Sequence, residues 1–165
     1  MTLLLVPSKT ELKHFLQLSS SWIQSDYLYQ NKGTGAYSKV DLYEIGVGAE
    51  AKKRVKELMS IAGNYSFIVL TGVCGAITPR LSPGDVLGVS SVRYKGELLE
   101  VDPGNGNLEA TMLTTDGIVE STELKEELHE QSGADAVDLE SYFIAESLIQ
   151  SDGFRVVKVV LDAHN

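Results

Sequence analysis

The stretch SFIVLTGVCGAITPRLSPGDVLGVSSVRY, residues 66–94, decides the fold. Its first seven residues, 66–72, are almost continuously apolar, which is typical of a strand covered on both faces. Gly72 and Gly75 then open a turn where the backbone can approach a ligand or another strand closely. Residues 85–94 are rich in β-branched side chains and favour a second strand after that turn.

The rest of the chain alternates between strand-like and helix-like segments. Short apolar runs indicate strands, whereas apolar residues at helical spacing and capping serines indicate helices. We expect strands at 2–7, 40–46, 111–115 and 154–162, helices that start at Ser8, at 49–62, at Ser121 (ending near Gly133) and at 136–149, and a flexible loop at 103–107. This alternation predicts one α/β domain over residues 1–165 with an at least partly parallel sheet, whose ligands bind beyond the carboxyl ends of strands.

The composition argues against several classes of function. The chain has 165 residues and a formal net charge of -9, which disfavours nucleic acid and anionic membranes as partners. No apolar run reaches the roughly 20 residues that span a bilayer, and the N-terminus lacks a secretory leader pattern, so we expect a soluble, cytoplasmic protein. Cys74 is the only cysteine, and no two histidines have a metal-ligand spacing. We therefore expect no metal site.

Three segments carry a resemblance to a known family. They are LTGVCGAITPRLSPGDVL (70–87), ADAVDLESYFIAE (134–146) and VVKVVLD (156–162), and IGVGAEAKKRV (45–55) adds a fourth match. Together they resemble the nucleoside phosphorylase and nucleosidase superfamily, which includes purine nucleoside phosphorylases and methylthioadenosine/adenosylhomocysteine nucleosidases. The resemblance implies a three-layer α/β/α domain with a central mixed sheet. Within the superfamily, residues 114–140 look closest to a branch associated with adenosylhopane cleavage.

The family resemblance also implies an activity and an assembly. It implies cleavage of the N-glycosidic bond of a small-molecule purine nucleoside or thionucleoside, without a cofactor, by a homodimer or a larger homo-oligomer. Relatives usually continue through a further loop and a long helix, whereas this chain stops three residues after Asp162. We therefore expect a C-terminally short member that lacks this helix.

Asp162 is the first candidate catalytic residue. The resemblance places it where the family has the aspartate that protonates the leaving base, and such a carboxyl must carry a proton near neutral pH. Apolar surroundings at the end of a strand raise the pKa of a carboxyl by desolvation. The alternative is that Asp162 only caps a turn at the end of its strand.

Glu140 and Leu139 match the family's ribose-binding motif, with leucine in place of methionine. The Glu140 carboxylate would accept both ribose hydroxyls and support the positive charge that develops on the sugar. The alternative is a first-turn glutamate favoured by the helix dipole. Asp138 would share a face with Glu140 in an extended backbone, which makes it a candidate partner of Glu140.

Glu11 has two interpretations that the sequence leaves open. Nucleosidases of the family have near this position a glutamate that positions the attacking water. However, Ser8 and Glu11 also have the S-x-x-E spacing of a capping box, in which each side chain binds a free backbone N–H at the start of a helix.

The remaining candidates are substrate-binding residues. Backbone N–H groups along Gly72, Val73, Cys74 and Gly75 would face the nucleophile or the base, although these glycines could serve only close strand packing. Ile118 and Val119 stand where the family has a purine-stacking aromatic residue. They would form an apolar slot instead.

The nucleophile is expected to be water. The family's phosphate-binding arginine and serine are matched here by Leu70 and Val73, which have no side-chain donors. Arg80 and Arg93 are nearby in sequence and are candidate replacements, so phosphorolysis stays an alternative. A third possibility is a degenerate member that binds a nucleoside or a protein partner without turnover.

Overall fold

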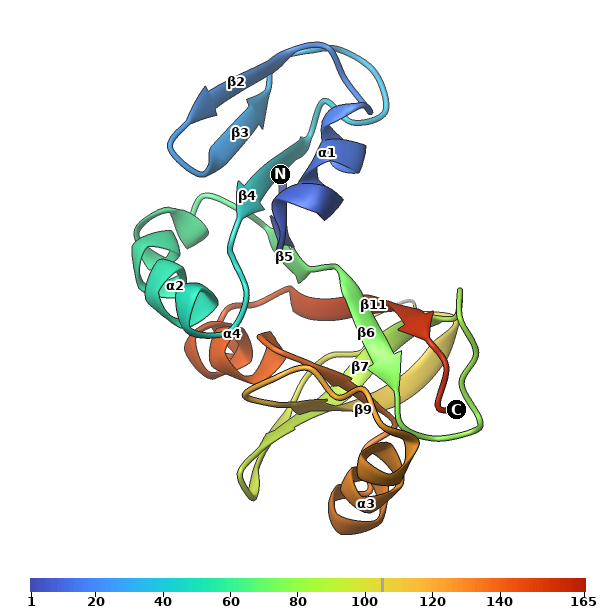
Figure 1. Cartoon of the computed structure of the whole chain (residues 1–165). Coiled ribbons are helices and arrows are strands. Elements are labelled where there is room, and N and C mark those ends of the chain that lie inside the picture. Colours follow the sequence, from blue (N-terminus) through green and yellow to red (C-terminus); the bar gives the residue numbers. More distant parts are fainter. Residues whose placement is uncertain (105) are drawn as a thin grey trace.

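The structure is a computed structural model that describes residues 1–104 and 106–165. In chain order the first half contains β1 (Thr2–Val6), α1 (Lys9–Leu16), β2 (Trp22–Ser25), β3 (Leu28–Asn31), β4 (Val40–Glu44), α2 (Ala49–Ala62) and β5 (Phe67–Leu70). The second half contains β6 (Val73–Ala76), β7 (Val86–Tyr94), β8 (Glu97–Glu100), β9 (Leu108–Thr114), α3 (Thr122–Ser132), β10 (Ala136–Asp138), α4 (Ser141–Leu148) and β11 (Phe154–Asp162). Figure 1 shows their arrangement.

One mixed sheet organises the molecule. Its strand order is β2-β3-β4-β1-β5-β11-β6-β10-β9-β7-β8. The central pairs β4–β1, β1–β5, β5–β11 and β11–β6 are parallel, while the β2–β3 and β7–β8 pairs are antiparallel. The predicted α/β class with a mixed, partly parallel sheet is therefore confirmed.

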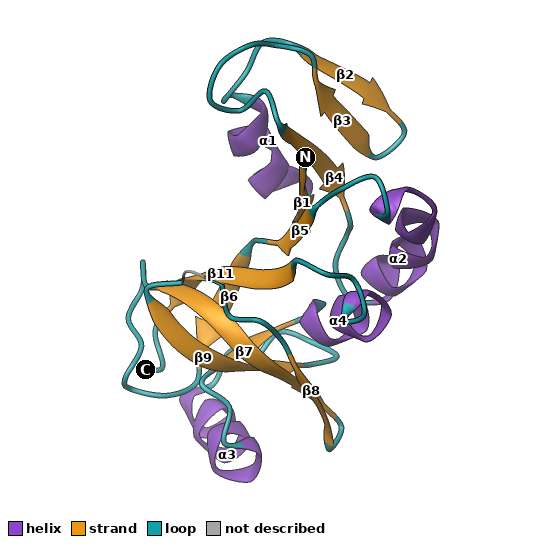
Figure 2. Cartoon of the chain, turned by 180° about the vertical axis from the view of Figure 1, so that it is seen from behind, coloured by secondary structure: helices purple, strands orange, loops and turns teal. Residues whose placement is uncertain are grey.

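Helices cover both faces of the sheet. Side chains of β1 point alternately to its two sides. Leu3 and Leu5 belong to the main core beneath α2 and α4, whereas Val6 packs with Leu12 of α1 in a smaller cluster on the other side. Figures 1 and 2 show α1 on one side of β1 and β4, with α2 and α4 on the other. These are the three layers that the family resemblance implied.

The half of the sheet that follows β5 curls on itself. Strand β11 pairs with β6 on one side and, along Val157–Val159, antiparallel with β7 on the other. Because β7 also pairs with β9, β9 with β10, and β10 with β6, these five strands close into a ring. The C-terminal end of β11 thereby lies beside β6, and its last residue, Asp162, contacts Lys125 of α3.

The boundaries of most predicted elements agree with the structure, and two assignments were wrong. Residues 73–76 form strand β6 rather than only a turn, because Val73 and Cys74 pair with β11. Residues 136–138 form strand β10 rather than the start of a helix, because they pair with β6 and β9. The hairpin β2–β3 and strand β8 were not predicted, and β9 starts at Leu108 instead of Thr111. The predicted loop at 103–107 includes Asn105, which lies outside the described residues.

Among the described residues, 1–104 and 106–165, no helix is both long and apolar enough to cross a membrane. The same residues contain no cluster of His, Cys, Asp or Glu that could hold a metal ion.

Candidate active site

A cavity of about 250 Å³ collects almost all of the predicted site residues. It lies between α1, β6, the segment 115–119, the end of β10 and the end of β11. Glu11, Val73, Cys74, Gly75, Ile118, Val119, Leu139, Glu140 and Asp162 all line it. Gly72 does not line it, and neither do the alternative phosphate-binding candidates Arg80 and Arg93. Residues more than 60 positions apart in the chain therefore meet at one place.

Glu11 makes the capping-box contacts with Ser8 and a further contact with strand β6. Its Oε2 accepts hydrogen bonds from the backbone N–H of Ser8 (3.1 Å) and from the Ser8 hydroxyl (2.5 Å), and the Ser8 Oγ accepts from the N–H of Glu11. This is the predicted capping box. In addition, Glu11 Oε1 accepts from the backbone N–H of Val73 at 2.9 Å. The cap therefore directs the carboxylate toward β6 and the cavity.

Gly72 explains how Glu11 comes so close to β6. Its backbone has φ +131°, a region that favours glycine. A β-carbon at this position would lie 2.8 Å from Glu11 Oε1 and 2.9 Å from Pro7 Cγ. Gly72 does not line the cavity, but its lack of a side chain leaves room for the Glu11 carboxylate.

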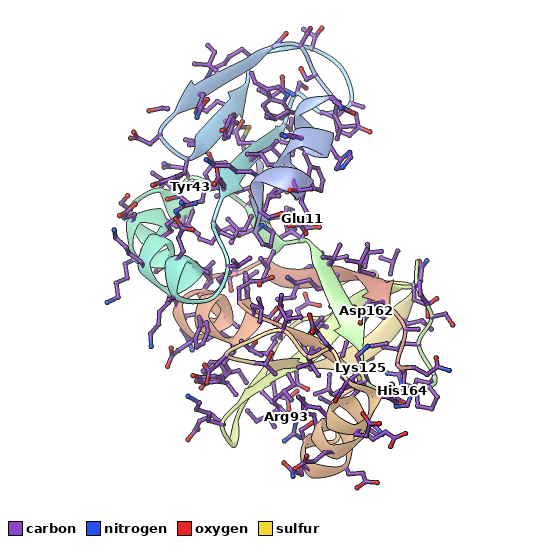
Figure 3. The ribbon with its side chains drawn as sticks, viewed as in Figure 1. Glu11, Tyr43, Arg93, Lys125, Asp162 and His164 are labelled. Atoms are coloured by element: carbon purple, nitrogen blue, oxygen red, sulfur yellow. The ribbon has the colours of Figure 1, made fainter. Side chains whose placement is uncertain are left out.

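Asp162 ends β11 next to a lysine that the sequence analysis missed. Its Oδ2 accepts a hydrogen bond from Lys125 Nζ of α3 at 2.7 Å, and the same ammonium donates to the Ala163 carbonyl at 2.5 Å. The Lys125 side chain is 6% exposed, whereas that of Asp162 is 53% exposed. The expectation that apolar surroundings desolvate Asp162 was therefore wrong. Its close partner is a buried cation, and Figure 3 shows the two residues together.

Gly75 lies directly beneath the Asp162 carboxyl group. The two residues are register partners in the β6–β11 pair, next to an irregularity between Val160 and Asp162. A β-carbon on Gly75 would lie 2.9 Å from Asp162 Oδ1. The absence of a side chain at position 75 therefore lets the carboxyl group lie over β6 at the cavity.

Glu140 is buried at the base of the cavity and is paired with Lys158 of β11. The Lys158 ammonium donates to Glu140 Oε1 and also forms an ion pair with Asp138 Oδ2 at 3.1 Å. Burial raises the pKa of Glu140 to about 7; the Lys158 ammonium opposes this shift and the Asp138 carboxylate adds to it. Burial alone would lower the pKa of Lys158, but the two carboxylates outweigh it and raise that pKa.

Asp138 connects the same cluster to the start of α4. Its Oδ1 accepts from the Thr114 hydroxyl at 3.0 Å and from the backbone N–H of Ser141 at 3.2 Å, and its Oδ2 accepts from the Ser141 hydroxyl. Thr114 Oγ1 in turn accepts from the N–H of Tyr142 at 2.9 Å. These contacts provide acceptors for the backbone N–H groups of Ser141 and Tyr142 in the first turn of α4. Asp138 is also linked to Glu140, as predicted, because both carboxylates bind the Lys158 ammonium.

Much of the remaining cavity wall is apolar. Ile118 is 77% exposed and Leu161 is 65% exposed although both line the cavity, so its mouth is open to solvent. Val119 and Val137 are buried deeper, in a small cluster with Ile77 and Leu113. Burial raises the pKa of the Cys74 thiol to about 12, which keeps it neutral. The wall therefore offers an apolar slot beside four carboxyl groups, those of Glu11, Asp138, Glu140 and Asp162.

The candidate phosphate-binding arginines lie elsewhere. Arg80 is paired with Asp135 at 2.8 Å and donates to the Glu109 carbonyl. Arg93 lines a second cavity of about 380 Å³ together with Tyr94 and Lys95. Neither arginine lines the cavity that holds Glu11, Glu140 and Asp162.

Sequence reasoning found the acidic residues of the site and missed its two lysines. Lys158 had a detectable signal, because a single charge within the apolar strand VVKVVLD indicates a buried, paired group. Lys125 had none, since it belongs to a charged, surface-like helix sequence.

Solved structures with known activities have the same fold. No family model and no curated protein gives a significant match to the sequence. The 5'-methylthioadenosine/S-adenosyl homocysteine nucleosidase of Helicobacter pylori superposes with a TM-score of 0.80 at 16% identity, over 99% of this chain and 85% of that chain. Futalosine hydrolase of the same organism gives a TM-score of 0.77 at 17% identity, over 98% and 87% of the two chains.

A third structure agrees with these two. A putative methylthioadenosine nucleosidase from Weissella paramesenteroides superposes with a TM-score of 0.79 at 18% identity, over 100% of this chain and 89% of that chain. At such low identities the likeness establishes architecture rather than activity. The chain thus has the fold of the methylthioadenosine/adenosylhomocysteine nucleosidases and of futalosine hydrolase.

Proposed function

We propose that the protein hydrolyses the N-glycosidic bond of a purine nucleoside or 5'-thionucleoside. The observation that carries this proposal is the convergence of Glu11, Glu140 and Asp162 on one cavity of about 250 Å³. The three carboxyl groups come from α1, from the start of α4 and from the end of β11. The nucleosidase fold supports the same reaction class.

Each carboxyl group has a separate task in this reaction. As the bond between the sugar C1′ and the base nitrogen breaks, positive charge grows on the sugar and negative charge on the base. Glu140 accepts the ribose hydroxyls and supports the positive charge, while Asp162 donates a proton to the base. Glu11 orients a water molecule and takes its proton as the water oxygen bonds to C1′. The products are the free sugar and the free base.

Water is preferred over phosphate as the nucleophile. A phosphate dianion needs several N–H or O–H donors, and arginine is the residue that binds it best. The cavity wall has apolar side chains at Val73 and Leu161, while Arg80 and Arg93 are absent from its lining. Among the described residues, the Lys or Arg side chain that contacts Asp162 is Lys125, whose ammonium is already bound to Asp162 and to Ala163.

A chromatographic assay tests the proposal. The purified protein is incubated with adenosine, inosine, methylthioadenosine and adenosylhomocysteine, each with and without phosphate, and the free base is measured. We expect base and free sugar without phosphate, and loss of at least about 10²-fold in rate for Asp162→Asn, the range of one proton-transfer catalyst. Release only with phosphate would identify a phosphorylase, and no release with any substrate would contradict the enzyme hypothesis in favour of a binding role.

The cellular setting is part of the same proposal. We place the reaction in the cytoplasm, as expected from the sequence, and in a homodimer or larger homo-oligomer, as the family resemblance implies. The exposed apolar side chains at the cavity mouth, such as Ile118 and Leu161, are consistent with a site near a subunit contact. Sedimentation equilibrium of the purified protein tests the oligomeric part.

A further inference from the structure

The buried ammonium of Lys125 has no role in the reaction described so far. Lys125 is the only basic residue of α3 other than His129, and its side chain is 6% exposed. Burying an ammonium is costly unless it is paired and hydrogen-bonded. Both described partners of Lys125 belong to the end of β11, namely Asp162 Oδ2 and the Ala163 carbonyl oxygen. The Lys125 ammonium is therefore bound to the candidate acid, Asp162, and to the residue after it.

The two oxygens of Asp162 differ in their contact with Lys125. Lys125 Nζ binds Oδ2 at 2.7 Å. Both oxygens lie near Gly75, where a β-carbon would be 2.9 Å from Oδ1 and 3.3 Å from Oδ2. Gly75 itself lines the cavity. An ammonium on Oδ2 leaves Oδ1 as the oxygen able to carry a transferable proton toward a ligand.

We propose that Lys125 is a positioning residue that directs Asp162 Oδ1 into the cavity and stabilises the carboxylate formed when Asp162 gives up its proton. This inference rests on the proposed role of Asp162 as the acid. The step is a single proton transfer: the O–H bond at Oδ1 breaks, an N–H bond forms on the departing base, and the electron pair stays on the carboxylate. Lys125 keeps its own protons throughout.

Other ionisable groups surround Asp162 without replacing Lys125. Glu11 from α1, Cys74 from β6, and Asp138 and Glu140 from the β10–α4 junction line the same cavity, and their charges, where present, are negative. Lys158 is committed to Asp138 and Glu140. His164 makes no hydrogen bond or ion pair with Asp162 in residues 1–104 and 106–165, although Figure 3 shows it on the same side as Lys125. Lys125 is thus the cation in contact with the candidate acid.

Two substitutions separate charge from shape. Lys125→Met keeps the aliphatic stem and removes the ammonium, whereas Lys125→Arg keeps a positive charge and N–H donors. Arg155→Met is the matched control, because it breaks an ion pair with Asp102 that lies outside the cavity. Each variant is first checked by circular dichroism and thermal melting.

The expected result concerns the pH dependence of turnover. Without the ammonium the ionised carboxyl is less stable, so the basic limb of the kcat/KM profile moves to higher pH by about one unit or more in Lys125→Met. We expect kcat at the optimum to fall at least about tenfold, with KM nearly unchanged. In Lys125→Arg the basic limb of the kcat/KM profile should stay near its wild-type position. In Arg155→Met both this limb and kcat at the optimum should be unchanged.

A second measurement does not depend on turnover. The ¹³C shift of the Asp162 carboxyl carbon is titrated in the wild type and in the variants, and its midpoint should move upward in Lys125→Met and stay in Lys125→Arg. Should the methionine variant not fold, Lys125→Gln keeps an N–H donor without the charge and is expected to move the midpoint in the same way. Unchanged midpoints in the uncharged variant would overturn the inference. No base release by the wild type would contradict the proposed function instead.

Discussion

The backbone N–H of Val73 donates a hydrogen bond of 2.9 Å to Glu11 Oε1, which joins the first helix to strand β6 across 62 positions of the chain. The same carboxylate closes the capping box with Ser8 through its other oxygen. The two interpretations of Glu11 that the sequence left open are therefore compatible, because the cap fixes the carboxylate at the cavity.

Glu11→Gln is expected to lower turnover by at least about 10²-fold, because the amide cannot take the proton of the attacking water. Glutamine at position 11 can also complete the capping box with Ser8, so the free energy of unfolding should change by less than about 1 kcal/mol. Ser8→Ala is the control, since it weakens the same cap and keeps the carboxylate. Steady-state kinetics and urea unfolding measure the two effects, and equal turnover of Glu11→Gln and the wild type would reduce Glu11 to a capping residue.

Gly75→Ala is expected to displace the Asp162 carboxyl group, because the new β-carbon would lie 2.9 Å from Oδ1. A displacement of the order of 1 Å at a reacting group lowers the rate by about 10²-fold. Gly63→Ala serves as the control, since no heavy atom lies within 4 Å of a β-carbon there. Kinetics combined with a thermal melt check the prediction, which fails if both variants turn over substrate equally.

Lys158→Met is expected to be the most destabilising of these changes. It leaves the Asp138 and Glu140 carboxylates buried without their cation, and breaking a buried ion pair typically costs about 3–5 kcal/mol. Glu140→Gln in the same chain should recover part of this loss, because it removes one of the uncompensated charges. Denaturant unfolding of the single and double variants at pH 8 measures the recovery; a double variant less stable than Lys158→Met would show that repulsion between the two carboxylates is unimportant.

The stability of the wild type should depend on pH through Glu140. Its pKa rises from 4.5 to about 7 on folding, so the folded chain holds this proton more tightly than the unfolded chain. The stabilisation is fully present below pH 4.5 and is lost as the pH rises through about 7. Glu140→Gln lacks this group, so its melting temperature should fall less than that of the wild type between these two values. Parallel wild-type and variant curves would contradict the raised pKa.

Helix α2 and strand β10 differ in how well the sequence predicted them. Helix α2 matches its prediction at both ends, because its apolar residues recur at helical spacing and pack on the core. Residues 136–138 were misassigned because three apolar-rich residues before a helix carry no periodicity of their own. Their pairing with β6 and β9 makes them a strand, and both partners are distant in sequence.

The sequence by itself determined the α/β class, the order of the main elements and the three carboxyl groups of the candidate site, because apolar periodicity, capping residues and local motifs are properties of short segments. The tertiary structure alone decided the charges that surround those carboxyl groups. Lys125 reaches Asp162 from 37 positions away, and Lys158 reaches Glu140 from 18 positions away. Whether a carboxyl is buried, paired or open to water depends on which strands and helices meet, and that is set by the closure of the sheet around β11.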